Sequence, residues 1–152
     1  MAIGTTAHPG EHPNHTIAQR LWNAIANADA DELRAIMAPK CVWRMYGKSR
    51  WAGSYQGVDA ILEFLASLGE DADELQSDLE DIFVSDRGAV LRYTIHALRG
   101  DRVLDIEHLF LMQIDDERVV EAIFAPIDQH RHDRFWDDPV ARSRSWAAPH
   151  TP

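Results

Sequence analysis

The second half of the chain carries four β-strand-like segments that are joined by three very short polar turns. The segments cover residues 76–84, 89–98, 102–114 and 118–127. The turns between them read SDRG, RGD and DDE. Connections this short join neighbouring antiparallel strands, whereas parallel strands need a crossover of a dozen or more residues. The sequence therefore predicts a four-stranded antiparallel meander, and this restricts the fold more than any other feature.

The first third of the chain shows two segments with helical spacing of apolar residues. One runs from about Thr16 to Ala28 and contains Ile17, Leu21, Ala24 and Ile25. A second, short helix is expected after Asp29, because this residue and Glu32 have the spacing of a capping arrangement. Its inward-facing residues would be Leu33, Ile36 and Met37. We expect Pro39 to end this helix, since proline disrupts helical hydrogen bonding.

A strand and a third helix are expected between these helices and the meander. Residues 41–46, CVWRMY, are β-branched and aromatic enough for a strand. The Gly-containing segment WAGSYQG is expected to be a loop that leads into the helix. That helix would bury Val58, Ile61, Leu62, Leu65 and Leu68, and Gly69 would stop it. The order α-α-β-α-β-β-β-β predicts an α+β domain with helices packed on one face of the sheet.

The segment DIEHLFLMQI, residues 105–114, is apolar on both of its expected faces. Alternation predicts that His108, Phe110, Met112 and Ile114 point inward. Leu109 and Leu111 would then point outward from the convex face of the sheet. An exposed apolar patch of this kind favours association, so we expect a homodimer that forms through the convex face.

Length and charge exclude several classes of protein. A chain of 152 residues has room for one domain with a substantial core. The net charge of −10 and the lack of a Lys/Arg stripe argue against a nucleic-acid partner. No apolar run approaches the roughly 18 residues of a membrane span, and no signal-peptide core is visible. With Cys41 as the single cysteine, we expect a cytoplasmic protein without a disulfide.

The two ends of the chain lack hydrophobic periodicity. Residues 1–14 are expected to be a flexible arm, residues 15–136 the folded domain, and residues 137–152 a second tail in which Trp146 could dock on a subunit surface. Three histidines near the start lack a fixed geometry, and HRH at 130–132 lacks the i, i+4 spacing of helical ligands. We therefore expect neither a metal site nor a cofactor.

The passages WRMYG, WAGSYQG and ERVVEAIFAPIDQHRHDRFW, taken in this order of elements, resemble the SnoaL-like branch of the nuclear transport factor 2-like superfamily. The likeness covers roughly residues 15–136. It implies a conical half-barrel, in which a curved, mainly antiparallel sheet is covered by the N-terminal helices around a deep pocket, in a dimer. Ketosteroid isomerases, limonene epoxide hydrolase and polyketide cyclases share this fold, so the fold alone does not give the function.

The isomerase members of that superfamily have site residues that this chain does not match. Their base aspartate falls at or beside Arg44, their oxyanion-hole tyrosine near Leu21, and their protonated aspartate near Phe110. Ketosteroid isomerase depends on two carboxyl groups that are tuned to different roles. Steroid isomerase activity is therefore not expected.

The candidate catalytic residues are His108, Asp128, Arg44 and His96. An imidazole titrates near neutral pH, so His108 could act as the acid or base and Asp128 could orient it. Arg44 and His96 would bind a substrate oxygen. We expect Arg44, His96 and His108 to share one cavity under the first and third helices. The expected pocket wall comprises Trp22, Trp43, Tyr46, Arg92, Thr94, Phe110, Met112 and Phe124.

Each of these roles has a purely structural alternative. Arg92 and His96 could lie on a solvated face, since Leu91, Tyr93 and Ile95 form the more apolar face of their strand. His108 could be a core histidine that is held by a backbone carbonyl, and Asp128 could cap the segment QHRHDRFW. The favoured function is a small acid–base isomerase, cyclase or hydrolase that acts on a hydrophobic oxygenated molecule. The alternative is a non-catalytic domain that binds such a molecule or mediates assembly.

Overall fold

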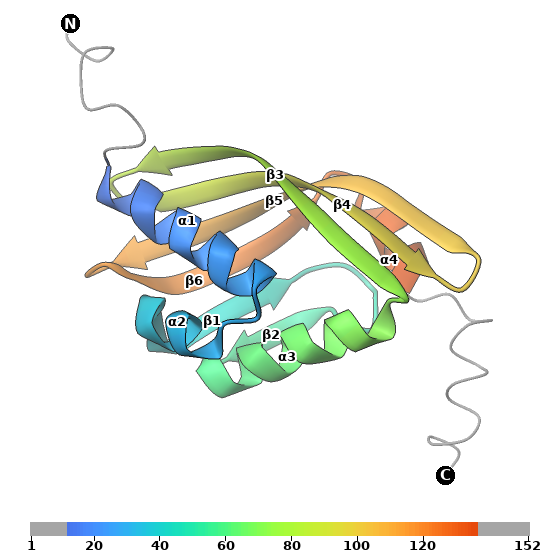
Figure 1. The fold of residues 1–152 in the computed structure, drawn as a ribbon, viewed down its shortest axis with the longest axis horizontal. Helices are drawn as coiled ribbons and strands as arrows, with labels where there is room; N and C mark the ends of the chain where they lie inside the picture. Colours follow the sequence, from blue (N-terminus) through green and yellow to red (C-terminus); the bar gives the residue numbers. More distant parts are fainter. Residues whose placement is uncertain (1–11, 137–152) are drawn as a thin grey trace, which may run out of the picture.

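The computed structural model describes residues 12–136, and the expected C-terminal tail and most of the N-terminal arm lie outside this range. Four helices and six strands make up the described chain (Figure 1). In chain order they are α1 (Pro13–Ala26), α2 (Ala30–Ile36), β1 (Met37–Met45), β2 (Gly53–Gln56), α3 (Val58–Asp71), β3 (Glu74–Ser85), β4 (Gly88–Arg99), β5 (Arg102–Asp115), β6 (Arg118–Pro126) and α4 (Gln129–Trp136). No helix in this range is long and apolar enough to cross a membrane.

The six strands form one sheet in the order β2-β1-β6-β5-β4-β3. The meander β3-β4-β5-β6 is antiparallel throughout, as its short turns predicted, and β1 joins it by pairing parallel to β6. Figure 1 shows the sheet curving around α1, α2 and α3, which lie on one side of it. Helix α1 packs against β3 and β4, whereas α3 packs against β1 and β2. The α+β prediction is confirmed.

Several element boundaries differ from the sequence-based expectation. Helix α1 begins at Pro13, where a proline costs no helical hydrogen bond, and the ring of His12 caps it by accepting from the Asn14 N–H at 3.0 Å. Pro39 does not end α2, because the chain has already entered β1 at Met37. The expected loop WAGSYQG contains the edge strand β2, and QHRHDRFW forms the helix α4.

The start of α2 agrees with the sequence-based reading. The side chain of Asp29 accepts a hydrogen bond from the Glu32 N–H at 3.1 Å, which satisfies one of the free donors at the helix N-terminus. Leu33, Ile36 and Met37 are all buried. The capping arrangement and the inward face of this helix are therefore confirmed.

Strand β5 alternates as predicted, although its sequence is apolar on both faces. His108, Phe110, Met112 and Ile114 are buried against the helices. Leu109 is half-buried and Leu111 is 38% exposed on the opposite, convex face. The inner face of this strand thus lies at the centre of the core, while the outer face keeps an apolar surface.

Candidate functional site

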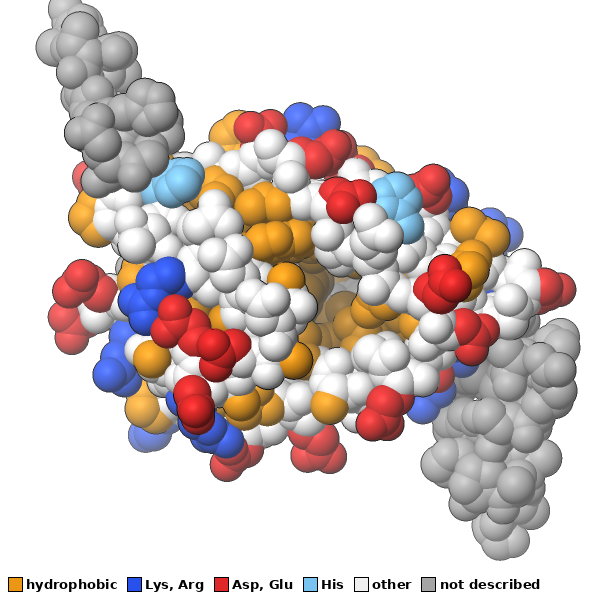
Figure 2. Space-filling view, viewed as in Figure 1, with side chains coloured by type: hydrophobic (Ala, Val, Ile, Leu, Met, Phe, Trp, Pro, Cys, Tyr) orange, Lys and Arg blue, Asp and Glu red, His pale blue; other side chains and the backbone are white. Residues whose placement is uncertain are grey.

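The interior between the helices and the sheet is the principal candidate site. Helices α1 and α3 cover different halves of the concave face, because one rests on β3 and β4 and the other on β1 and β2. Figure 2 shows the surface hollowed in the region of these helices, with hydrophobic side chains gathered inside the hollow. Half-buried apolar residues around the core include Trp22, Ile25, Tyr55, Leu62, Leu65, Leu79, Ile95 and Phe124.

Aromatic rings line much of this interior. Trp43 on β1 meets Phe110 on β5 edge-on at 5.1 Å between ring centroids, and Phe110 meets Phe124 on β6 at 4.6 Å. On the α1 side, Trp22 leans on Tyr93 at 5.1 Å. Edge-to-face contacts of this kind stabilise a pair by roughly 0.5–1.5 kcal/mol beyond area burial. They hold the walls of the hollow in one arrangement.

His108 lies in this aromatic interior and has no carboxylate partner. Its ring stacks on Tyr93 at 5.5 Å and meets the ring of His132 edge-on at 5.2 Å. Its Nδ1 is buried without a hydrogen-bond partner. Burial, followed by the neighbouring His132, lowers the pKa of His108 to about 3, although a hydrogen bond with the Ile106 backbone opposes this shift. The imidazole is therefore neutral at physiological pH.

The neighbour of His108 comes from an element that sequence reasoning did not expect to be a helix. Helix α4 presents His132, Phe135 and Trp136 to the core, and all three are buried. Burial lowers the pKa of His132, and Asp133 partly offsets this effect. The apolar and aromatic spacing within QHRHDRFW was a usable signal, since residues 132, 135 and 136 share one helix face.

Asp128 does not orient His108. It is exposed, and its carboxylate accepts a hydrogen bond from the Arg131 N–H at 3.1 Å at the start of α4. The alternative in which Asp128 caps the last element is therefore confirmed. Among the described residues, no carboxylate contacts His108, and the ionisable group that acts on its pKa is His132.

Arg44 and His96 lie on the opposite face of the sheet from His108, so the expected common cavity is wrong. Arg44 pairs with Glu121 at 2.5 Å on the convex face. The ring nitrogens of His96 contact Asp78 at 3.2 Å and Asp105 at 2.5 Å. Tyr93 stands directly opposite His108 in the β4–β5 register, and side chains alternate along a strand, which sends His96 to the other face.

The expected pocket wall divides between the two faces in the same way. Arg92 pairs with Glu107 at 2.9 Å and Thr94 donates to Glu80 at 3.2 Å, both on the convex face, and Tyr46 is 57% exposed just after β1. The prediction that these three residues line the pocket is therefore wrong, and the solvated alternative for Arg92 and His96 is correct. The remaining residues of the expected wall pack in the core or against it: Trp22, Trp43, Phe110, Met112 and Phe124.

The interior contains few other groups that could carry charge. Burial raises the pKa of the Cys41 thiol to about 11 and raises that of the Tyr93 hydroxyl, so both are neutral at physiological pH. Among residues 12–136 no group of three or more His, Cys, Asp or Glu side chains could hold a metal ion. The concave interior therefore offers an apolar hollow (Figure 2) with neutral hydrogen-bonding groups.

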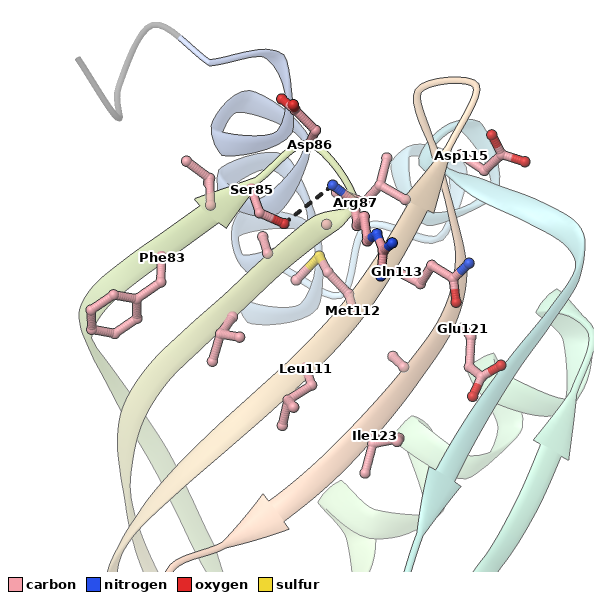
Figure 3. A pocket seen from close by; sticks show the side chains of 16 residues that line it. Phe83, Ser85, Asp86, Arg87, Leu111, Met112, Gln113, Asp115, Glu121 and Ile123 are labelled. Carbon is pink, nitrogen blue, oxygen red and sulfur yellow. Dashed lines mark hydrogen bonds between the residues drawn. The ribbon is translucent and has the colours of Figure 1, made fainter. Parts of the chain in front are cut away.

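A second, open depression of about 830 Å³ lies at one end of the convex face. Figure 3 shows Leu111 and Ile123 side by side on adjacent strands of this depression, with Gln113 and Glu121 beyond them. Phe83 at its edge is 52% exposed. This depression and the interior hollow are separated by the sheet.

Comparison with known proteins agrees with this geometry. Residues 18–122 match the family model described as the SnoaL-like domain. The uncharacterized protein Rv0034 of Mycobacterium tuberculosis is 29% identical over 133 residues, which cover 86% of this chain and 94% of that protein. Its name assigns no activity.

Two solved structures show the same fold. Bal32a, from a soil-derived mobile gene cassette, has a TM-score of 0.76 at 24% identity, over 82% of this chain and 96% of that one. A protein from Jannaschia sp. CCS1, provisionally named a SnoaL-like polyketide cyclase, has a TM-score of 0.71 at 19% identity, over 88% and 97%. With the family model spanning most of the folded chain, this protein belongs to the SnoaL-like domain family.

Proposed function

We propose that this protein binds a small, mostly apolar molecule in the hollow between α1 and α3. The observation that supports this most directly is the hollow itself, in which hydrophobic side chains gather (Figure 2). Cavities with apolar walls and a few polar groups are the usual form of small-molecule sites. Aromatic walls favour a ligand that presents flat apolar surface to them.

The polar groups of the interior restrict the ligand further. His108, His132, Tyr93 and Cys41 are neutral at physiological pH, because burial shifts their pKa values toward the uncharged forms. An ionised ligand would lose its hydration without gaining a countercharge, which costs several kcal/mol. We therefore expect a neutral ligand whose oxygen atoms, if present, accept hydrogen bonds from neutral donors.

A titration with a neutral fluorescent probe, N-phenyl-1-naphthylamine, tests this proposal. The half-buried Trp22 packs on Tyr93 beside the hollow. Because Trp22→Ala removes this aromatic wall, it should weaken probe binding at least about tenfold, which corresponds to roughly 1.4 kcal/mol. Phe83→Ala is the matched control, because it removes an aromatic ring from the convex face. Equal binding by both variants and the wild type would contradict the proposal.

A second candidate function is acid–base catalysis on the bound molecule, and the contact between His108 and His132 favours it. Two imidazoles with ring centroids 5.2 Å apart, each with a buried and unpartnered Nδ1, form the polar centre of an apolar interior. With its pKa near 3, His108 is unprotonated at neutral pH, so it would act as a weak general base that accepts a proton from the bound molecule. On a verified substrate, His108→Gln should lower turnover by about a hundredfold or more, whereas unchanged turnover would leave only the binding role.

A further inference from the structure

Two hydrogen bonds and several ring contacts hold helix α4 over one end of the interior. The Lys48 N–H donates to Asp133 at 2.8 Å, and the Arg99 guanidinium donates to the Phe135 carbonyl at 3.1 Å. The ring of Trp136 meets that of Trp51 edge-on at 6.3 Å. The helix has eight residues and contacts mainly β5 and β6. Short elements of this kind can open locally while the rest of a protein stays folded, and opening of α4 would expose the buried Phe135 and Trp136.

The surface buried under α4 holds polar atoms that have no partner. His132 on α4 and His108 on β5 touch there, and both are at least 98% buried. The Nδ1 atoms of both rings and the Nε1 of Trp51 lack hydrogen-bond partners. An unpaired buried polar atom costs roughly 1–3 kcal/mol relative to the same atom in water. Docking of α4 therefore leaves three polar atoms unsatisfied that opening would hydrate.

We propose that α4 is a pH-operated plug, which is docked at neutral pH and released when His108 and His132 take up protons. Docking excludes water from both rings and brings them into contact, so two imidazolium ions in this position would repel each other without solvent to screen them. Release separates the rings and returns both to water. The inference is independent of the ligand-binding proposal, since it concerns only the contact between α4 and the sheet.

The other ionisable groups at this contact do not cancel the effect. The ring of His108 stacks on that of Tyr93, whose hydroxyl stays neutral. The Nδ1 of His132 lies 3.8 Å from the carboxylate of Asp133. Arg99, at the other end of α4, is neutralised by Asp71 at 3.4 Å. Desolvation dominates at both histidines and lowers the pKa of each, and the coulombic effect of His132 on His108 acts in the same direction. Asp133 favours the charged form of His132 but only partly offsets its burial.

The sign and size of the response follow from linkage. The docked pKa of His108 is about 3 and its ordinary value is 6.5, so the open state binds the proton more tightly. The docked state is therefore favoured fully above pH 6.5 and loses its advantage as the pH falls toward 3. Between pH 7.5 and 4.5 the opening equilibrium should rise by about a hundredfold from His108 alone. His132 adds to this in the same direction.

Amide hydrogen exchange on the full chain, corrected for the intrinsic rate at each pH, tests the proposal. We expect the protection of α4 amides to fall by about a hundredfold or more from pH 7.5 to 4.5. Amides at the centre of β5 should stay better protected than those of α4 at each pH. Equal protection of α4 and β5 would mean a single global unfolding reaction and would overturn the proposal. So would α4 protection that does not change with pH.

Two variants assign the response to the buried pair. The double substitution His108→Phe and His132→Phe keeps flat rings and removes both titrating groups, so the fall in α4 protection should shrink to below about threefold. His130→Phe is the control, because His130 is exposed on the same helix, and it should keep the full response. If α4 protection still falls with pH in the double variant, or no longer falls in the control, the assignment of the response to His108 and His132 is wrong. The comparison of α4 with β5 in the wild-type chain does not depend on either variant.

Discussion

Replacing Phe110 by alanine should be among the most destabilising single changes in the chain. Phe110 is 1% exposed, and its ring contacts those of Trp43 and Phe124 at centroid distances of 5.1 and 4.6 Å. Truncating a buried phenylalanine costs about 3–5 kcal/mol through lost transfer free energy and the cavity that remains. Two edge-to-face contacts are lost as well, so we expect a cost at the upper end of this range.

The same substitution at Phe83 is the matched control. Phe83 is 52% exposed on β3, so its truncation removes the same atoms but leaves no cavity and should cost about 1 kcal/mol or less. Urea unfolding, monitored by tryptophan fluorescence, gives both free energies of unfolding if the slope with denaturant is unchanged. Measurements at two protein concentrations separate folding from association. Similar costs at the two positions would refute the assignment of the β5 faces.

Three further predictions concern the glycine beside α4, the convex face and the response to acid. A Cβ at Gly47, whose φ is +103°, would lie 2.5 Å from the Asp133 carboxylate and clash with the Gln129 amide. Gly47→Ala should therefore lower the free energy of unfolding in urea by about 2–3 kcal/mol. The control Gly69→Ala, which has open space around it in α3, should raise that free energy by about 0.5–1 kcal/mol. The apolar convex face favours a homodimer, and Leu111→Lys should convert it to a monomer in sedimentation equilibrium; a wild-type chain that sediments as a monomer at micromolar concentration would remove this proposal. Finally, because the pKa of His108 is depressed in the folded chain, the free energy of unfolding should fall by up to about 5 kcal/mol from this group as the pH drops from 6.5 toward 3. A His108→Phe chain with the same pH dependence as the wild type would show that other groups are responsible.

The fold was predictable because its signals are local. The turns SDRG, RGD and DDE are too short for anything but hairpins, and the strands on either side of them pair as expected. The capping arrangement at Asp29 and the helical spacing of α3 likewise depend on residues a few positions apart. The prediction that Gly69 stops α3 is wrong, since the helix continues to Asp71. Strand β2 and helix α4 were missed because each is short, so the periodicity signal had few residues to accumulate over.

The candidate site was only half predictable from the sequence. By itself the sequence determined that His108 faces inward, because alternation along β5 places it with Phe110 and Met112. It could not say which face of β4 meets that interior, since a shift of one residue in pairing exchanges the two faces of a strand. Only the tertiary structure decided that Tyr93 and not His96 stands opposite His108, and that Arg44 and Arg92 form ion pairs on the convex side. The contact of His108 with His132 also depended on tertiary structure, because it joins residues 24 positions apart through the docking of a helix, and no local spacing encodes that approach.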